Sequence, residues 1–242
     1  MKLSVILPCY NEKDNLEALF QRLDLLVQAK PDIEIVLVNN GSTDGSDLVF
    51  KNELAKRNSN NYKVYTVEKN IGYGFGILSG LQSATGDVLS VTHADRQTDP
   101  MDVLKAFEIY KNENNPFLLV KGFRKNRQIT EALFSYGMGV IASIALSTRL
   151  TEINAQPKLF SKLFFEKIQN DAPHDFSLDL YFLYQAKRIG KIAHFPVYFA
   201  KRVAGVAKGG SGSSFKTKWK LIKRSFNYIF ELRKSIQSGR IK

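Results

Sequence analysis

The chain has 242 residues, of which 44% are hydrophobic and 24% charged, a composition that excludes wholesale disorder and fits a soluble globular protein. Its formal net charge of +12 favours a polyanionic partner: an anionic membrane surface, a phosphorylated substrate or nucleic acid. The single cysteine, Cys9, excludes an internal disulfide framework and predicts a reducing compartment. We expect neither a secretory signal nor a membrane-spanning helix, because no window is long and apolar enough.

The first 120 residues alternate between short β-branched runs and amphipathic stretches. The runs predict strands at Leu3–Leu7, Ile33–Val38, Lys63–Val67, Asp87–Val91 and Phe117–Val120. The stretches predict helices at about Asn15–Gln28, Asp44–Lys56, Gly74–Ala84 and Met101–Asn112. This alternation predicts an α/β fold with a Rossmann-like, mostly parallel sheet flanked by helices.

After Val120 the pattern changes. A basic turn is predicted at Lys121–Arg127, and a Gly/Ser-rich linker at 209–214. Between them we expect an apolar helix at about Thr130–Leu146, a strand near Ala155–Phe160, a helix at about Ser177–Ile189 and a strand at Ala193–Phe199. The apolar helix can line a lipid-facing groove or belong to the core.

The tail from Ser213 to Lys242 carries nine Lys or Arg residues and one acid, Glu231, and so holds +8 of the +12. Apolar residues recur in it at helical spacing: Phe215, Trp219, Ile222, Phe226, Ile229 and Phe230. This pattern predicts an amphipathic basic helix suited to an anionic membrane surface. The alternative is a helix packed on the body with a solvated basic face. No nucleic-acid-binding module precedes the tail, so we exclude nucleic acid as the partner.

Polar clusters follow three of the predicted strands, at Pro8–Glu12, Asn39–Asp44 and His93–Gln97. Ligands of parallel sheets bind at the carboxyl ends of the strands, so these clusters predict a binding site. Ser42 or Asp44 can cap the following helix, whose free amides would attract an anion. Asp95, flanked by two further donors, can hold a divalent cation that bridges a diphosphate. Both segments can also be simple turns.

Two further features bear on phosphate binding. The Gly-rich segment Asn70–Gly76 lacks a Walker lysine, and we interpret it as a helix entrance that passes close to a ligand or another strand. Basic residues gather at Lys121, Arg124 and Arg127, and again at Arg202 and Lys208. Such residues in glycine-containing loops suit phosphate oxygens, and a solvated basic loop is the alternative.

These motifs, in this order, resemble the family 2 glycosyltransferases, and most closely their dolichyl-phosphate mannose synthase-like, polyprenyl-phosphate branch. The resemblance runs from Leu3 to about Lys208. It rests on the three polar clusters, on Ala84–Asp87, on Asn154–Phe160 with Asp179, and on a late Arg-x-x-Gly-x-x-Lys pattern at Arg202, Gly205 and Lys208. It implies an A-type glycosyltransferase fold and inverting transfer of a sugar from a nucleoside-diphosphate sugar.

The resemblance also implies roles for individual residues. Catalytic roles fall on Asp95, Arg124, Arg127, Asp179 and Arg202. The nucleotide would be held by Pro8, Tyr10, Asn11, Glu12, Asn39, Asn40, Ser42, Gly72, Ala94 and Asp95. Phosphate or acceptor contacts fall on Lys121, Arg124, Arg127, Gln156, Arg202 and Lys208. A divalent metal, Mn²⁺ or Mg²⁺, would be bound by Asp95 with Gln97 and His93.

The acceptor implied is a polyprenyl phosphate at the cytoplasmic face of the cell membrane, with the protein bound there peripherally. A glycan hydroxyl is the alternative, and it would need a general base such as Asp175 or Asp179. The family usually has acids where this chain has Asn39, Asn40, His93 and Asn154, so a catalytically weakened nucleotide-binding protein is a third possibility. We expect three parts: a nucleotide-sugar-binding half at 1–120, an acceptor-binding half at 121–212, and the tail at 213–242.

Overall fold

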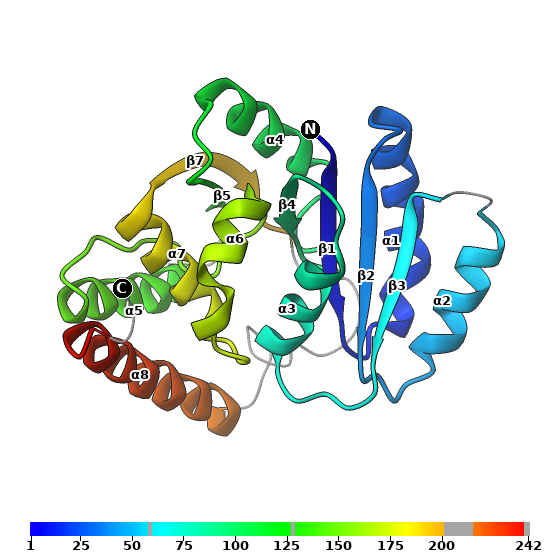
Figure 1. The fold of residues 1–242 in the computed structure, drawn as a ribbon. Helices are drawn as coiled ribbons and strands as arrows, with labels where there is room; N and C mark the ends of the chain where they lie inside the picture. Colours follow the sequence, from blue (N-terminus) through cyan, green and yellow to red (C-terminus); the bar gives the residue numbers. More distant parts are fainter. Residues whose placement is uncertain (58–59, 127–128, 201–214, 240–242) are drawn as a thin grey trace.

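The computed structural model describes residues 1–57, 60–126, 129–200 and 215–239. Within them, one seven-stranded sheet runs through the molecule in the order β3-β2-β1-β4-β6-β5-β7 (Figure 1). The strands are β1 (Leu3–Cys9), β2 (Glu34–Asn40), β3 (Tyr62–Val67), β4 (Val88–Val91), β5 (Leu118–Lys125), β6 (Lys158–Ser161) and β7 (Lys191–Tyr198).

Strand β6 is antiparallel to both of its neighbours, β4 and β5, and the other pairs in the sheet are parallel. Strands β4 and β5 therefore point the same way, and their carboxyl ends share an edge with the start of β6. In this register Lys121 of β5 lies opposite Lys158 of β6. The predicted mostly parallel sheet is confirmed, and its one reversed strand brings two lysines together.

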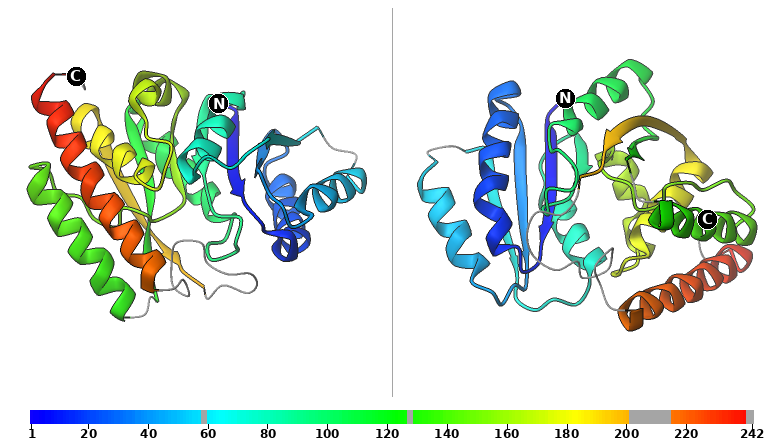
Figure 2. Two further views of the ribbon diagram at one scale, coloured as in Figure 1. Left: turned by 90° about the horizontal axis from the view of Figure 1, so that it is seen from below. Right: turned by 180° about the vertical axis from the view of Figure 1, so that it is seen from behind.

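Helices cover both faces of the sheet (Figures 1 and 2). One face packs against α1 (Lys13–Ala29), α2 (Ser46–Ala55) and α4 (Asp102–Glu113). The other packs against α3 (Tyr73–Ser83), α5 (Ile129–Ala145), α6 (Lys162–Ile168), α7 (Leu178–Ile189) and α8 (Phe215–Gln237), and a short 3₁₀ turn, Gln169–Asp171, follows α6. Every residue of β2 is buried, as expected for a strand covered on both faces. Strand β3, at the edge, instead exposes Lys63 and other side chains between partly buried ones.

Most predicted elements are found within a few residues of their expected bounds, but one prediction is wrong. The basic turn expected from Lys121 is the second half of β5, which continues to Lys125 and pairs with β7. Helix α6 was not predicted from the sequence.

The tail contains helix α8, which packs on the body of the protein rather than standing apart from it. Its Ile229 and Leu232 are 1% and 2% exposed and belong to the core on the α3 side of the sheet. In the part of the chain that the structure describes, no helix combines the length and apolarity needed to cross a bilayer.

Candidate functional site

The loops that follow β1 and β2 are bound to each other. The backbone N–H of Asn11 donates to Ser42 Oγ at 3.1 Å, and Asn11 Oδ1 accepts from the backbone N–H of Thr43 at 2.8 Å. The backbone N–H of Lys13, which opens α1, donates to Asp44 Oδ2 at 3.0 Å. The two predicted nucleotide loops are thus adjacent. Asp44 accepts hydrogen bonds from the first backbone N–H of α1 and, at 3.0 Å, from that of Ser46 at the start of α2.

Asn39 and Asn40 end β2 and are both 3% exposed. Asn39 Oδ1 accepts from the backbone N–H of Ser42 at 3.1 Å, which shapes the turn. Asn40 Nδ2 donates to the carbonyl of Gly72 at 3.0 Å, so β2 is joined to the entrance of α3. A carboxylate at position 40 could not donate this bond. The amide is therefore explained by a contact within the protein itself.

The loop after β4 carries the predicted metal-binding residues. Asp95 Oδ1 accepts from the backbone N–H of Gln97 at 3.1 Å, and Arg96 between them has a left-handed φ of 62°. The backbone N–H of Ala200 donates to the carbonyl of Gln97 at 2.8 Å, which fastens the loop to the chain beyond β7. The buried Ala94 packs into the core on the α1 side of the sheet. Asp95 and His93 are half-buried at the carboxyl end of β4.

A buried ion pair lies beside this loop. The Lys158 side chain, at the start of β6, is fully buried and pairs with Asp179 Oδ1 at 2.5 Å. Gln156 Nε2 donates to the same oxygen at 3.1 Å, and Lys158 Nζ also donates to the carbonyl of Ala155. Asp179 stands in the first turn of α7 and is 5% exposed. Asp179 is therefore an interior carboxylate with a cation partner, not a residue of the helix surface.

Two basic residues of β5, Lys121 and Arg124, have partners from the segment around residue 152. Lys121 is completely buried, and its Nζ donates to the carbonyls of Thr151 and Glu152. Burial, and next the neighbouring Lys158 cation, lower the pKa of Lys121 to about 6. Arg124 pairs with the Glu152 carboxylate at 2.7 Å. Lys121 is thus an interior side chain, and its predicted role as a phosphate ligand stays a prediction.

His93 lies where these groups meet. Burial lowers the pKa of its imidazole, the Asp95 and Asp179 carboxylates oppose that shift, and the Lys158 and Arg124 cations add to it. The four charged groups, at residues 95, 124, 158 and 179, come from four different elements or their ends, yet all act on the His93 imidazole. We call these five side chains, with Gln156, the polar cluster.

Tyr73, the first residue of α3, is a member of this site that sequence reasoning missed. Its ring stacks on Phe176 with centroids 4.8 Å apart and planes at 8°. Burial, followed by the charges of Asp179 and Asp95, raises the pKa of its phenol, and a contact with the Gln156 amide opposes the rise. Tyr73 therefore bridges the Gly-rich segment and the polar cluster.

The glycines around Tyr73 explain why the signal was misread. A Cβ on Gly74 would lie 2.5 Å from the carbonyl oxygen of Pro173 and 2.7 Å from that of Asp175. The backbone N–H of Phe75 donates to the carbonyl of His174 at 2.9 Å. The predicted close approach is thus to the loop before α7. The sequence signal for Tyr73 was its position between Gly72 and Gly74, because a residue with a Cβ at either position would clash with the loop before α7.

The polar side chains after β4 suit a metal site that has few ligands from the protein. Among the residues that the structure describes, no three His, Cys, Asp or Glu side chains are grouped to hold an ion. A carboxylate, an imidazole and an amide oxygen, from Asp95, His93 and Gln97, are chemically suited to Mn²⁺ or Mg²⁺. Ions of this kind commonly take one or two carboxylates from the protein and their other ligands from substrate phosphates and water. The residues fit such an ion only together with a phosphate-bearing ligand.

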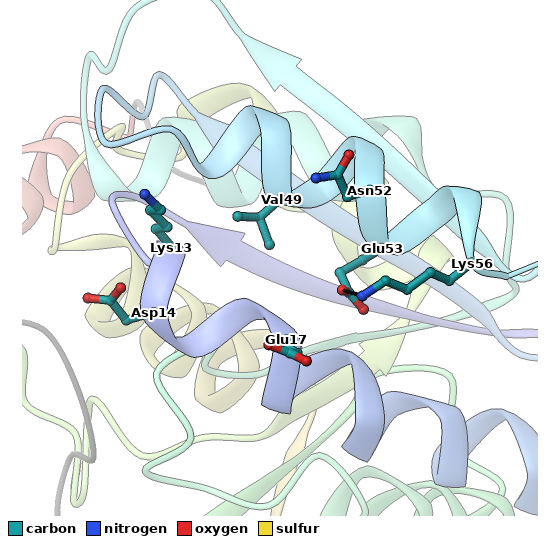
Figure 3. A pocket seen from close by; sticks show the side chains of 7 residues that line it. All are labelled: Lys13, Asp14, Glu17, Val49, Asn52, Glu53 and Lys56. Carbon is teal, nitrogen blue, oxygen red and sulfur yellow. Dashed lines mark hydrogen bonds and ion pairs between the residues drawn. The ribbon is translucent and has the colours of Figure 1, made fainter.

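Three predicted site residues, Arg127, Arg202 and Lys208, lie outside the described side chains. The other predicted nucleotide residues, Pro8, Tyr10, Glu12 and Gly72, lie in or beside the bound loops. A separate hollow lies between α1 and α2 (Figure 3) and is lined by Lys13, Asp14, Glu17, Val49, Asn52, Glu53 and Lys56. None of the predicted site residues lines it.

Residues 4–173, well over half of the chain, match the family described as glycosyl transferase family 2. The chain belongs to this family. The family match includes both predicted nucleotide loops, the predicted metal-binding loop and Lys158, and it ends before Asp179. The predicted family is confirmed.

Relatives within the family include enzymes named for polyprenyl-phosphate acceptors. The chain is 32% identical over 216 residues to a dolichol-phosphate mannosyltransferase of Pyrococcus furiosus, covering 86% of this chain and 59% of that relative. It is 29% identical over 128 residues to an undecaprenyl-phosphate 4-deoxy-4-formamido-L-arabinose transferase of Proteus mirabilis, covering 52% of this chain and 38% of that relative. The chain therefore spans less than two thirds of the length of either.

Solved structures of family-like proteins share the fold. The crystal structure of glucosyl-3-phosphoglycerate synthase from Mycobacterium tuberculosis with uridine diphosphate superposes with a TM-score of 0.72 at 16% identity, covering 96% of this chain and 80% of that one. The same synthase with Mn²⁺, uridine diphosphate and glucosyl-3-phosphoglycerate gives a TM-score of 0.64 at 17% identity, covering 84% and 72%. The predicted A-type glycosyltransferase fold is confirmed.

Proposed function

We propose that the protein is an inverting glycosyltransferase that moves a sugar from a nucleoside-diphosphate sugar to a polyprenyl phosphate. Membership of glycosyl transferase family 2 supports the reaction class. The names of the Pyrococcus and Proteus relatives support the lipid-phosphate acceptor. The place of the polar cluster, at the carboxyl ends of β4 and β5, suits a ligand site in such a sheet.

On the donor side, the nucleotide would be held by the paired loops after β1 and β2, through Tyr10, Asn11, Asn39 and Ser42. Asp95, with His93 and Gln97, would hold the divalent cation. When bound, such a cation stabilises the negative charge that builds on the departing diphosphate. Arg124 has five N–H donors, so its pairing with Glu152 is compatible with a phosphate contact. We propose the same contact for Arg127, Arg202 and Lys208.

The single observation that carries the choice of acceptor is the Lys158–Asp179 pair. A hydroxyl acceptor needs a base to take its proton. Asp179 is poorly placed to be that base, because protonation would break an ion pair buried beside Gln156. A phosphate acceptor is already an anion and needs no base. Its oxygen attacks the anomeric carbon from the side opposite the diphosphate, whose bond breaks as the new one forms.

Two alternatives remain, each with its own observation. Transfer to a glycan hydroxyl is favoured by Asp175, which stands near the start of α7 as the second candidate base. A catalytically weakened nucleotide-binding protein is favoured by the neutral side chains at Asn39, Asn40, His93 and Asn154. The first predicts turnover with sugar acceptors, and the second predicts nucleotide binding without turnover.

The test is release of nucleoside diphosphate from a panel of nucleotide sugars, with Mn²⁺ or Mg²⁺, with and without a polyprenyl phosphate. Release that requires the lipid phosphate supports the proposal and identifies the donor sugar. Release only with glycans establishes the hydroxyl acceptor. Nucleotide binding without release under any condition refutes the transferase.

We further propose the location and division of labour that this reaction needs. A lipid acceptor requires the protein to work at a membrane surface, and we propose peripheral binding at the cytoplasmic face. Residues 1–120 would bind the donor and residues 121–212 the acceptor, within one catalytic domain. The basic segment at 213–242 would contribute the attraction to anionic lipids.

A further inference from the structure

The side-chain amide of Gln156 carries a buried acceptor that the protein does not use. Gln156 is 1% exposed, so its amide is shielded from solvent. Among the residues that the structure describes, no group donates a hydrogen bond to Gln156 Oε1. Buried oxygens of this kind are nearly always paired, because an unpaired one loses its hydrogen bonds to water and gains nothing in return. The unpaired oxygen of Gln156 is therefore a candidate contact for a ligand.

The partners of the Gln156 nitrogen fix which way the amide faces. Nε2 donates to Asp179 Oδ1 at 3.1 Å, and the phenol of Tyr73 contacts the same amide. If the amide were turned over, its oxygen would face the Asp179 carboxylate, which is paired with Lys158 and has no proton to donate. The unpaired atom is thus the oxygen, and a group that completes its hydrogen bonding has to be a donor.

Gln156 lies at the edge of the sheet that holds the predicted metal-binding loop. Strand β6 begins two residues later and pairs with β4, with Lys158 opposite Val91. Continuing this antiparallel register places Gln156 opposite His93. On its other side Gln156 approaches β5, because a Cβ on Gly122 would lie 2.4 Å from the backbone carbonyl oxygen of Gln156. Gln156 therefore stands between the carboxyl ends of β4 and β5.

The order of the strands gives the order of the parts of a donor bound along this edge. In the proposed function the loops after β2 and β1 hold the nucleoside, and the loop after β4 holds the diphosphate with its cation. The next strand in the sheet is β6, which Gln156 precedes. In a nucleotide sugar the sugar follows the diphosphate, so its hydroxyls would reach the level of Gln156.

The other groups expected at this edge match an unpaired acceptor less well. A diphosphate and a polyprenyl phosphate present oxygens that accept hydrogen bonds and, near neutral pH, have few protons to donate. A divalent cation can bind an amide oxygen. However, Lys158 and Gln156 share Asp179 Oδ1, so a cation on Gln156 Oε1 would lie close to the Lys158 ammonium. A hydroxyl is a donor without charge and suits the oxygen best.

We propose that Gln156 Oε1 accepts a hydrogen bond from a hydroxyl of the sugar in the donor, and that Gln156 thereby helps to determine which sugar is transferred. Tyr73 is the positioning residue, because its ring is held by the stack on Phe176 and its phenol contacts the amide. A sugar without the matching hydroxyl would leave the buried oxygen unpaired, which makes such a contact selective. The inference rests on the proposed function for the class of ligand, and it adds the residue that recognises the sugar.

The test is calorimetric titration of the whole chain with Mn²⁺, comparing each nucleotide sugar with its own nucleoside diphosphate. The probes are UDP-glucose, UDP-galactose, UDP-N-acetylglucosamine and GDP-mannose, with UDP and GDP. Gln156→Met keeps the length of the side chain and removes both polar atoms. We expect it to bind the nucleotide sugar preferred by the wild type about fivefold or more weakly, and to bind UDP and GDP as the wild type does.

Deoxy analogues of the preferred donor, each lacking one sugar hydroxyl, identify the partner of the oxygen. One analogue should bind the wild type more weakly than the parent sugar does, and Gln156→Met should bind that analogue and the parent equally. Tyr73→Phe keeps the ring and removes the hydroxyl, so it should show a smaller loss for the same parent sugar. If Gln156→Met does not fold, as judged by circular dichroism, Tyr73→Phe and the wild type with the deoxy analogues carry the test.

Gln185→Met is the matched control, because Gln185 is also a buried glutamine. It is 2% exposed in α7, and its Oε1 accepts from Arg188 Nε at 3.0 Å. All affinities should be unchanged in this variant. An equal loss of UDP or GDP binding in Gln156→Met overturns the proposal, since the oxygen then serves the diphosphate or its cation. Unchanged binding of every nucleotide sugar, or equal binding of all deoxy analogues by the wild type, overturns it as well.

The failure of the sugar contact and that of the transferase give different results, because binding of the donor needs no acceptor. Weaker sugar binding in Gln156→Met without transfer to any acceptor by the wild type refutes the proposed function and supports the contact. Lipid-dependent diphosphate release with the same KM for the donor in Gln156→Met supports the proposed function and overturns the contact. An effect of Gln156→Met on glycan acceptors alone also overturns it, since the hydroxyl then belongs to the acceptor.

Discussion

The buried pair between Lys158 and Asp179 gives the sharpest test of how the site is held together. Lys158→Met keeps the length and apolar stem of the side chain and removes its charge. The Asp179 carboxylate, whose side chain is 6% exposed, would then retain the Gln156 amide but lose its cation. Leaving one member of a buried pair uncompensated costs about 3–5 kcal/mol.

That cost is a large part of the total stability of a domain, which is about 5–15 kcal/mol. For a chain of this size 1 kcal/mol shifts the melting temperature by about 2–4 °C, so we expect a decrease of roughly 6–20 °C. Urea denaturation monitored by circular dichroism measures the free energy of unfolding, and a thermal melt measures the shift. Adding Asp179→Leu to Lys158→Met should recover most of the loss, because hydrocarbon then replaces both charges.

Lys191→Met is the control for loss of a lysine as such. Lys191 pairs with Glu113 on the surface, where the two side chains are 58% and 38% exposed. Its removal should cost about 0–1 kcal/mol. A loss below about 1 kcal/mol for Lys158→Met, or no recovery in the double variant, would refute the view that the pair is a coupled, buried unit.

Three further predictions follow from the site and its surroundings. Asp95→Ala should abolish metal-dependent diphosphate release and leave the melting temperature within a few degrees of the wild type, because the Asp95 side chain is only half-buried at the end of β4; unchanged turnover would remove Asp95 from the metal site. Lys121 has a pKa of about 6 in the folded protein and an ordinary pKa of 10.5. Between these pH values the unfolded chain binds one proton more than the folded protein at this lysine. The free energy of unfolding should therefore rise with pH by up to about 1.4 kcal/mol per pH unit. Lys121→Met has no amine to titrate, so its free energy of unfolding lacks this pH dependence. Denaturation at pH 7, 8 and 9 should therefore show the stability of the wild type rising relative to that of the variant, and parallel curves would contradict the assignment. Gly74→Ala should cost on the order of 1–3 kcal/mol through its clash with the loop before α7, whereas Gly137→Ala in α5, with nothing within 4 Å, should gain up to about 1 kcal/mol in the same assay; equal effects would disprove the close approach.

The sequence by itself determined the kind of fold and the edge at which the site lies. Continuous apolar runs such as Ile35–Val38 are typical of strands covered on both faces, and their alternation with amphipathic stretches favours parallel neighbours. The polar residues after β1, β2 and β4 are then brought to one edge, whatever the details of packing. These features depend on residues that are close together in the chain, so they can be predicted from the sequence alone.

Lys121 shows what only the tertiary structure decided. Lysines and arginines next to a glycine are typical of an exposed turn, and the sequence gives no sign that Lys121 is buried. It is buried because the carbonyls of Thr151 and Glu152, thirty residues away, accept its N–H groups. Likewise Asp179 is a buried partner of Lys158 because the reversed strand β6 places that lysine beneath the first turn of α7.

Tyr73 and helix α5 make the same distinction. Tyr73 belongs to the site only because its glycine neighbours let the chain approach Pro173 and His174 closely enough to stack its ring on Phe176. Apolar periodicity identified α5 as a helix but left open whether its second side meets the core or the outside. Burial depends on which elements surround a helix, and that is fixed by contacts between segments far apart in the sequence.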